Sequence, residues 1–215
     1  MSNVKIDGVR RTLDRRPRTD TRNKPWRNRR TARRWRYWNT RTFFRQGEDP
    51  MCVAWAMLNR LACQPIGLRE SDHVGARGLY HFAKEFDEWE GSDYDGTSAL
   101  GVVKFLNHFE IFSAYYWPDS AAQVANAILT TAPVLIGTWL YEGMAWPTDG
   151  RMTTDGRALG GHEMLADGAS LDDRGLRIKT WDETWGLGGH GWLSFEDFDA
   201  LMADGGDAVV TIPSE

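Results

Sequence analysis

The chain has 215 residues, a net charge of −4 and 41% hydrophobic residues, which is typical of a globular protein with a sizeable core. It contains no run of 18 apolar residues and no apolar stretch near its start, so neither a membrane span nor a secretory signal is expected. Two cysteines are too few for a disulfide framework.

The net charge hides a strong asymmetry. Residues 1–45 hold 14 Arg and 2 Lys against 3 Asp, whereas the remaining residues hold 10 basic and 27 acidic side chains. This pattern indicates a basic arm on an acidic body. Two explanations stay open. Residues 1–34 could bind nucleic acid or another acidic surface, or they could lie on the acidic body of their own chain or of a neighbour.

Residues 1 to about 30 show neither a helical nor a strand period, and we expect them to be extended. From Trp35 to Phe44 aromatic residues alternate with arginines. Such a segment could stack on bases, but we favour packing of these rings against the body. The domain division that follows is a basic arm over 1–34 and one folded domain over 35–215.

Helices are expected first and strands afterwards. The spacing of apolar residues predicts helices over 52–63, 74–89, 98–108 and 120–131. After Pro133 it predicts strands over 134–140, 163–169, 176–184 and 192–195, a short helix over 196–203 and a strand over 208–212. Helices followed by strands are typical of an α+β fold. We divide it into a helical half, 35–117, and a β-rich half, 118–215.

The first candidate site residue is Cys52, which opens the predicted helix 52–63 six residues after Gln46. Unpaired N–H groups and the positive end of the helix dipole favour a thiolate at such a position. A lone cysteine is more often a small core residue, and we expect Cys63 to be one.

Two later segments can complete a site around this thiol. His162 follows two glycines and enters a predicted strand, and 178–186 is a predicted strand that ends in acidic residues and Trp185. A cysteine nucleophile needs a base, the base needs an acceptor that orients its ring, and the oxyanion needs donors. Cys52, His162 and an acid near 183 can fill the first three roles. Gln46 and the Cys52 N–H can bind the oxyanion.

In these segments the chain resembles the papain-like cysteine peptidases. The family has Gln-Gly, four residues and then Cys at a helix start, and Gln46-Gly47 and Cys52 match this spacing. Its histidine enters a strand and is followed six residues later by glycine, as His162 is by Gly168. The likeness covers about residues 35–205 and looks greatest to small bacterial and bacteriophage members. It implies an α+β papain-like fold with a cleft between the two halves.

One departure concerns the residue that orients the histidine. The family has Asn-Ser-Trp-Gly where this chain has Glu183-Thr184-Trp185-Gly186. We expect Glu183 to take the role because alternation along a strand puts it on the face of Trp185, with Asp182 as the rival acid. A second register, set by Trp181, would place Lys179 there, but lysine offers the imidazole no acceptor.

The resemblance implies a cysteine peptidase that hydrolyses peptide or isopeptide bonds of a peptide or protein substrate, without a cofactor or metal. Gly96, Thr97, Gly161 and Trp185 would contact the substrate or shield the site. No Cys/His spacing suggests zinc and no Gly-rich phosphate loop occurs. The other histidines, His73, His81, His108 and His190, are expected at the surface.

Two alternatives stay open. The first is a virion or assembly protein of phage type on a papain-like scaffold, whose basic arm binds nucleic acid or a partner protein. The second keeps the nucleophile but changes the bond, as in an amidase that acts on cell-wall peptide. Either way, the expected location is cytoplasmic or virion-associated.

Overall fold

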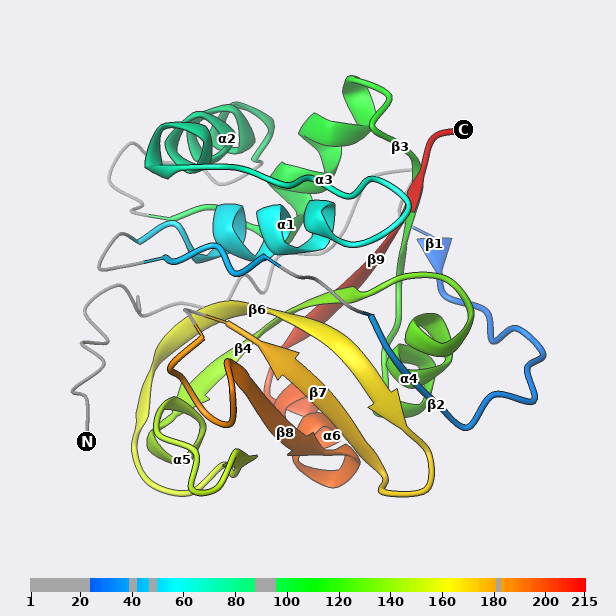
Figure 1. Ribbon diagram of the computed structural model, residues 1–215, viewed down its shortest axis with the longest axis vertical. Coiled ribbons are helices and arrows are strands. Elements are labelled where there is room, and N and C mark those ends of the chain that lie inside the picture. Colours follow the sequence, from blue (N-terminus) through cyan, green and yellow to red (C-terminus); the bar gives the residue numbers. More distant parts are fainter. Residues whose placement is uncertain (1–23, 39–41, 47–49, 88–95, 181–182) are drawn as a thin grey trace.

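The computed structural model describes residues 24–38, 42–46, 50–87, 96–180 and 183–215. Three helices pack against one another at the top of Figure 1: α1 (Cys52–Ala62), α2 (His73–Phe86) and α3 (Ala99–His108). Most of a mixed, largely antiparallel sheet lies below them. The α+β class predicted from the sequence is confirmed.

The strands form one sheet in the order β1-β3-β9-β4-β6-β7-β8-β5, and β2 pairs with β6 beside this path. The strands are β1 (Lys24–Pro25), β2 (Trp35–Tyr37), β3 (Phe112–Trp117), β4 (Val134–Tyr141), β5 (Arg151–Met152), β6 (Ala158–Ser170), β7 (Gly175–Lys179), β8 (His190–Ser194) and β9 (Asp207–Pro213). The long strand β6 pairs with β4, β7 and β2, so it is the centre of the β-rich half.

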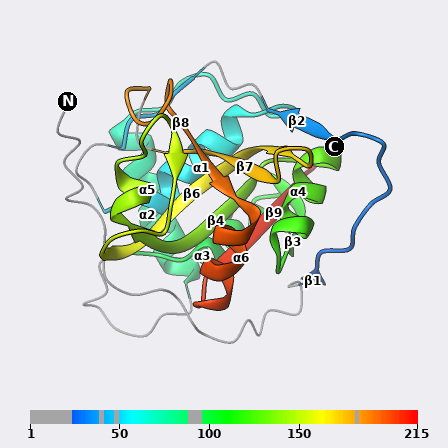
Figure 2. The ribbon, with the colours of Figure 1, turned by 90° about the horizontal axis from the view of Figure 1, so that it is seen from below.

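Three further helices contact the sheet. The helix α4 (Ala121–Thr130) packs against β6, and α6 (Phe195–Ala203) packs against α4, β4 and β8. In the view from below, α6 lies nearest the reader (Figure 2). The short α5 (Glu142–Ala145) follows β4 and contacts β5.

Local sequence signals explain where several helices begin. Asp72, Ser98 and Ser194 each accept a hydrogen bond from a backbone N–H in the first turn of α2, α3 and α6. The helix α1 is different because its residues from Val53 to Arg60 are all buried. It packs directly against β6, which brings the start of α1 to the strand that carries His162.

The structure confirms the predicted helices to within one to three residues and corrects several strands. β3 was not predicted, and it lies inside the segment assigned to the helical half. β6 begins at Ala158 rather than at 163, so His162 is an interior strand residue. β7 ends at Lys179, well before the predicted end at 184, and this difference changes the site.

The segment 24–38 packs on the body of its own chain. Its ends join the sheet through β1 and β2. Trp26 and Trp38 are buried, and their indole N–H groups donate to Asn126 Oδ1 (3.2 Å) and the Ile128 carbonyl (3.0 Å) of α4. The favoured packing of the rings from Trp35 to Phe44 therefore holds for Trp38 and Phe44, whereas Trp35 and Tyr37 are exposed. Residues 1–23 lie outside the described residues.

No helix in the described ranges is both long and apolar enough to cross a membrane.

Candidate active site

Cys52 is the first residue of α1, a helix buried along most of its length. The N-cap residue Met51 provides no side-chain hydrogen bond to this end of the helix. The first-turn N–H groups therefore point toward the start of the helix, where the thiol lies. Cys52 is a free thiol that keeps part of its surface exposed, whereas Cys63, at the other end of α1, is fully buried, as expected of a core residue.

The structure brings Cys52 to the strand that carries His162. His162 lies in the interior of β6, the strand against which α1 packs. The backbone N–H of Glu163, the next residue, acts on the Cys52 thiol and lowers its pKa, against the larger effect of burial. The Cys52 sulfur at the start of α1 thus faces β6 at Glu163, the residue after His162.

Thr180 contacts the His162 ring. Its Oγ1 lies 2.9 Å from His162 Nε2, and both residues are buried. With Nε2 hydrogen-bonded to this hydroxyl, Nδ1 is the ring atom that can exchange a proton with Cys52. Sequence reasoning missed Thr180. The available signal was the second alignment with the family pattern, which is set by Trp181. Thr180 directly precedes Trp181, but only Lys179 was weighed in that alignment.

Glu183 lies elsewhere than the alternation argument placed it. β7 ends at Lys179, and Glu183 is exposed in a turn, so it does not share a strand face with Trp185. Its carboxylate accepts two hydrogen bonds from Arg45, one from Nε at 3.1 Å and one from Nη2. Asp182, the rival acid, lies outside the described residues.

Burial sets the charge of the two central groups. It raises the pKa of the Cys52 thiol to about 11, an effect that the Glu163 carboxylate increases and hydrogen bonds from backbone N–H groups oppose. Burial lowers the pKa of His162 to about 3. Burial thus favours the uncharged forms of both groups, the thiol and the imidazole.

Two acidic side chains meet beside this site. Gly137 on β4 lies opposite Glu163 on β6 and Asp207 on β9. A Cβ at Gly137 would lie 2.7 Å from Glu163 Oε2 and 2.9 Å from Asp207 Oδ1, so only glycine leaves room for both carboxylates. Glu163 also acts on the site, because its carboxylate raises the pKa of the Cys52 thiol.

The other predicted site residues have varied surroundings. Gln46 is buried at the end of segment 42–46, and Gly161 is half-buried in β6 opposite Trp139. Trp185 is buried, and its indole N–H donates to the Ala145 carbonyl at 3.1 Å. Its ring packs over Gly191, where a Cβ would approach to 2.5 Å. Trp185 therefore fills the space between α5 and β8.

Thr97 has a structural contact. Its Oγ1 donates to Asp87 Oδ2 at 2.9 Å, and the Ser98 N–H donates to the same oxygen at 2.8 Å. These bonds join the end of α2 to the start of α3. Gly96 is half-buried at the edge of the described range, after residues 88–95, which lie outside it.

One of the other histidines differs from its prediction. His190 is half-buried rather than at the surface: its Nε2 lies 3.4 Å from Asp167 Oδ2, and its Nδ1 hydrogen-bonds the Gly188 carbonyl at 3.0 Å. Within the described ranges, no three His, Cys, Asp or Glu side chains are grouped as a metal ion would require.

Comparison with solved structures identifies the architecture. Xylellain, a cysteine protease from Xylella fastidiosa, superposes with a TM-score of 0.76 at 14% identity, over 100% of this chain and 99% of its own. The chain has the papain-like fold. Digestive procathepsin L 3 from Tenebrio molitor larval midgut gives a TM-score of 0.71 at 13% identity, over 97% of this chain and 77% of its own.

Bromelain from Ananas comosus, solved in complex with the inhibitor E64, gives a TM-score of 0.61 at 11% identity, over 85% of this chain and 100% of its own. No family model matches the sequence. No curated protein matches it either. The structural comparisons thus confirm the predicted papain-like fold. Because the sequence identities are only 11–14%, they show the fold and not the activity.

Proposed function

We propose that the chain is a cysteine peptidase in which Cys52 is the nucleophile and His162 the general base and acid. One observation carries the proposal. The start of the buried helix α1 packs against β6, and there the backbone N–H of Glu163, the residue after His162, acts on the Cys52 thiol. A thiol and an imidazole held together at the start of a helix are suited to acyl transfer.

The proposed reaction has four steps. The Cys52 thiol gives its proton to His162 Nδ1 while the sulfur attacks the substrate carbonyl carbon. The oxyanion is bound by the Gln46 side-chain amide and the Cys52 backbone N–H. His162 then protonates the leaving amine, and the C–N bond breaks. Water that gives a proton to His162 hydrolyses the thioester and releases the thiol.

We propose that Thr180 takes the orienting role that the sequence suggested for Glu183. If the Nε2–H donates to Thr180 Oγ1, the lone pair of Nδ1 can accept the thiol proton. Asp182 stays a predicted alternative. Labelling of Cys52 by an epoxysuccinyl probe of the E64 type, abolished in His162→Ala, tests the proposed pair.

Thr180→Val removes this hydroxyl while it keeps the branched shape. Since one hydrogen bond is worth about 1 kcal/mol, kcat/KM for a fluorogenic peptide amide should fall roughly 3- to 10-fold. Thr180→Ser should recover most of the loss because it restores the hydroxyl. Equal rates for Thr180→Val and the wild type would exclude Thr180 as the group that orients His162.

The exposed basic loop supports a second candidate function, which is binding of single-stranded nucleic acid. Between β1 and β2 the chain forms a loop at one side of the molecule in both ribbon views (Figures 1 and 2), and Arg29 and Arg33 hydrogen-bond it to α4. Its arginines at 27, 29, 30, 33 and 34 are exposed. Next to them Trp35 and Tyr37 expose 60% and 40% of their surface, with ring centroids 5.6 Å apart. Basic side chains beside exposed rings suit a phosphate backbone and stacked bases.

A labelled oligothymidylate of about 20 nucleotides should bind this loop more weakly as salt increases. Replacement of Arg27, Arg29 and Arg30 by Gln should reduce the salt slope by about 2, since each phosphate contact contributes about 0.7 for single strands. Trp35→Ala should weaken binding roughly 10-fold through loss of stacking. Fluorescence anisotropy measures both effects, with the distant exposed variant Arg174→Gln as control. Binding that all variants retain, or none at low salt, would rule out this function.

A further inference from the structure

Gln46, the proposed oxyanion donor, is the last residue of a described segment with no helix or strand of its own. The segment 42–46 follows the β2 region and precedes α1. Phe44 and Gln46 are buried in it, while Arg45 between them is exposed. A segment that forms no helix and pairs with no strand is positioned by the side chains and carbonyl groups that it contacts.

Lys179, the last residue of β7, binds the start of this segment. Its Nζ donates to the Thr42 carbonyl at 2.6 Å, and it lies 4.0 Å from the centroid of the Phe43 ring. Lys179 is 1% exposed. A buried ammonium must keep its acceptors and its ring contact because it cannot exchange them for water at low cost. The position of Thr42 and Phe43 is therefore tied to the end of β7.

Phe43 also packs on the turn that enters β8. Its ring meets the His190 imidazole edge to face, with centroids 5.4 Å apart. A Cβ on Gly189 would lie 2.3 Å from Phe43 Cε1, and the Gly189 backbone has a φ of 80°. Only glycine allows this turn and this close approach together. The turn at Gly189 therefore holds the Phe43 ring in place.

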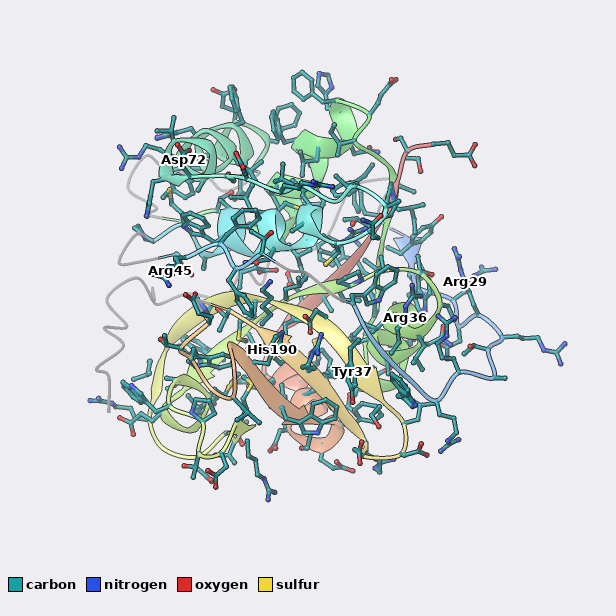
Figure 3. The ribbon with its side chains drawn as sticks, in the orientation of Figure 1. Arg29, Arg36, Tyr37, Arg45, Asp72 and His190 are labelled. Carbon is teal, nitrogen blue, oxygen red and sulfur yellow. The ribbon has the colours of Figure 1, made fainter. Side chains whose placement is uncertain are left out.

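Arg45, the residue before Gln46, pairs with Glu183. Two parallel hydrogen bonds join the guanidinium to the carboxylate. Both side chains are largely exposed, at 65% and 43%, so the pair adds little to the free energy of unfolding. Figure 3 shows Arg45 between the helical part and the β-rich part of the molecule. A contact of this kind can still fix the direction in which the next residue points.

We propose that Lys179, Phe43 and the Arg45–Glu183 pair are a clamp that positions Gln46 for oxyanion binding. The inference rests on the proposed function and extends it. The acid predicted to orient the base instead holds the segment that carries the oxyanion donor. Oxyanion donors must lie about 2.7–3.1 Å from the developing charge, so a small shift of this segment reduces turnover without removing the nucleophile.

The test compares two reactions of the same thiol. Hydrolysis of benzyloxycarbonyl-Phe-Arg-aminomethylcoumarin forms an oxyanion, whereas alkylation of Cys52 by iodoacetamide is a displacement that forms none. Lys179→Met should lower kcat roughly 10- to 100-fold, while KM and the alkylation rate stay nearly unchanged. The expected fall is smaller than the roughly 10²- to 10³-fold fall in kcat caused by removal of a whole oxyanion donor.

The Arg45–Glu183 pair allows a matched design. Glu183→Gln and Arg45→Glu should each lower kcat roughly 3- to 10-fold, as expected for loss of about 1 kcal/mol, and the double variant Arg45→Glu/Glu183→Arg should recover it. Glu196→Gln removes an exposed carboxylate bound to Arg174 and should change nothing. Three results would overturn the clamp. The first is an alkylation rate that falls in parallel with kcat, and the second is an unchanged kcat in Lys179→Met and Glu183→Gln. The third is a double variant that does not recover kcat.

Failure of the proposed function would look different, because the wild type itself would not hydrolyse the peptide. In that case, hydrogen–deuterium exchange tests the clamp independently of peptidase activity. Faster exchange of the peptide that covers 42–46 in Lys179→Met and Glu183→Gln than in the wild type would support it. Equal exchange in all three proteins would overturn it.

Discussion

Cys52→Ala is expected to abolish peptide hydrolysis. The variant keeps the helix α1, because alanine favours a helix, but it removes the sulfur that forms the acyl-enzyme. Loss of a nucleophile in such a site lowers kcat by about 10³-fold or more, to the level supported by binding and oxyanion contacts alone. Release of aminomethylcoumarin from the arginine-containing peptide, followed by fluorescence, measures this loss.

Cys63 provides the matched control. It is fully buried at the opposite end of α1, and burial raises the pKa of its thiol to about 12. Cys63→Ala should therefore keep the rate of hydrolysis, and mass spectrometry of wild-type protein treated with the epoxide should find the label on Cys52 only. Hydrolysis that persists in Cys52→Ala at the wild-type rate would refute the proposed nucleophile.

Acid should destabilise the protein through His162. Burial lowers its pKa from 6.5 to about 3, so between these values the unfolded chain binds a proton that the folded chain does not. The stabilising contribution is complete above pH 6.5 and is lost as the pH falls toward 3. Between pH 7 and pH 4 the loss is about 3 kcal/mol, at about 1.4 kcal/mol per pKa unit.

Urea unfolding at pH 7 and pH 4 measures this effect. His162→Gln, which cannot take up a proton, should lose about 3 kcal/mol less stability than the wild type over the same interval. The comparison isolates His162 because the carboxylates titrate in both proteins. Equal losses in the two proteins would show that the imidazole is not buried in a neutral form.

Much of the fold could be predicted because its helices carry their own signals. The apolar faces and the caps at Asp72, Ser98 and Ser194 mark α2, α3 and α6 in the local sequence. β3 could not be found in this way. Its pairing partner β9 lies almost one hundred residues later in the chain, and strand formation depends on such distant partners more than on local propensity.

The candidate site was predictable where its residues are positioned by local structure. Cys52 at a helix start and His162 in a strand both follow from local pattern, and the structure brings their elements together. Glu183 was misplaced because alternation along β7 was continued past Lys179, where the strand ends. Its partner Arg45 lies 138 positions away in the sequence, so no local pattern could indicate it.

The place of β9 in the sheet has a consequence for synthesis of the chain. β9 lies between β3 and β4, although both of these strands are made well before it. The sheet therefore stays open on the ribosome until residues 207–213 have emerged and inserted between two strands already present. His162 lies on β6, which pairs with β4 and so belongs to the same sheet. Cys52 is thus made early, whereas the sheet that carries His162 is completed last.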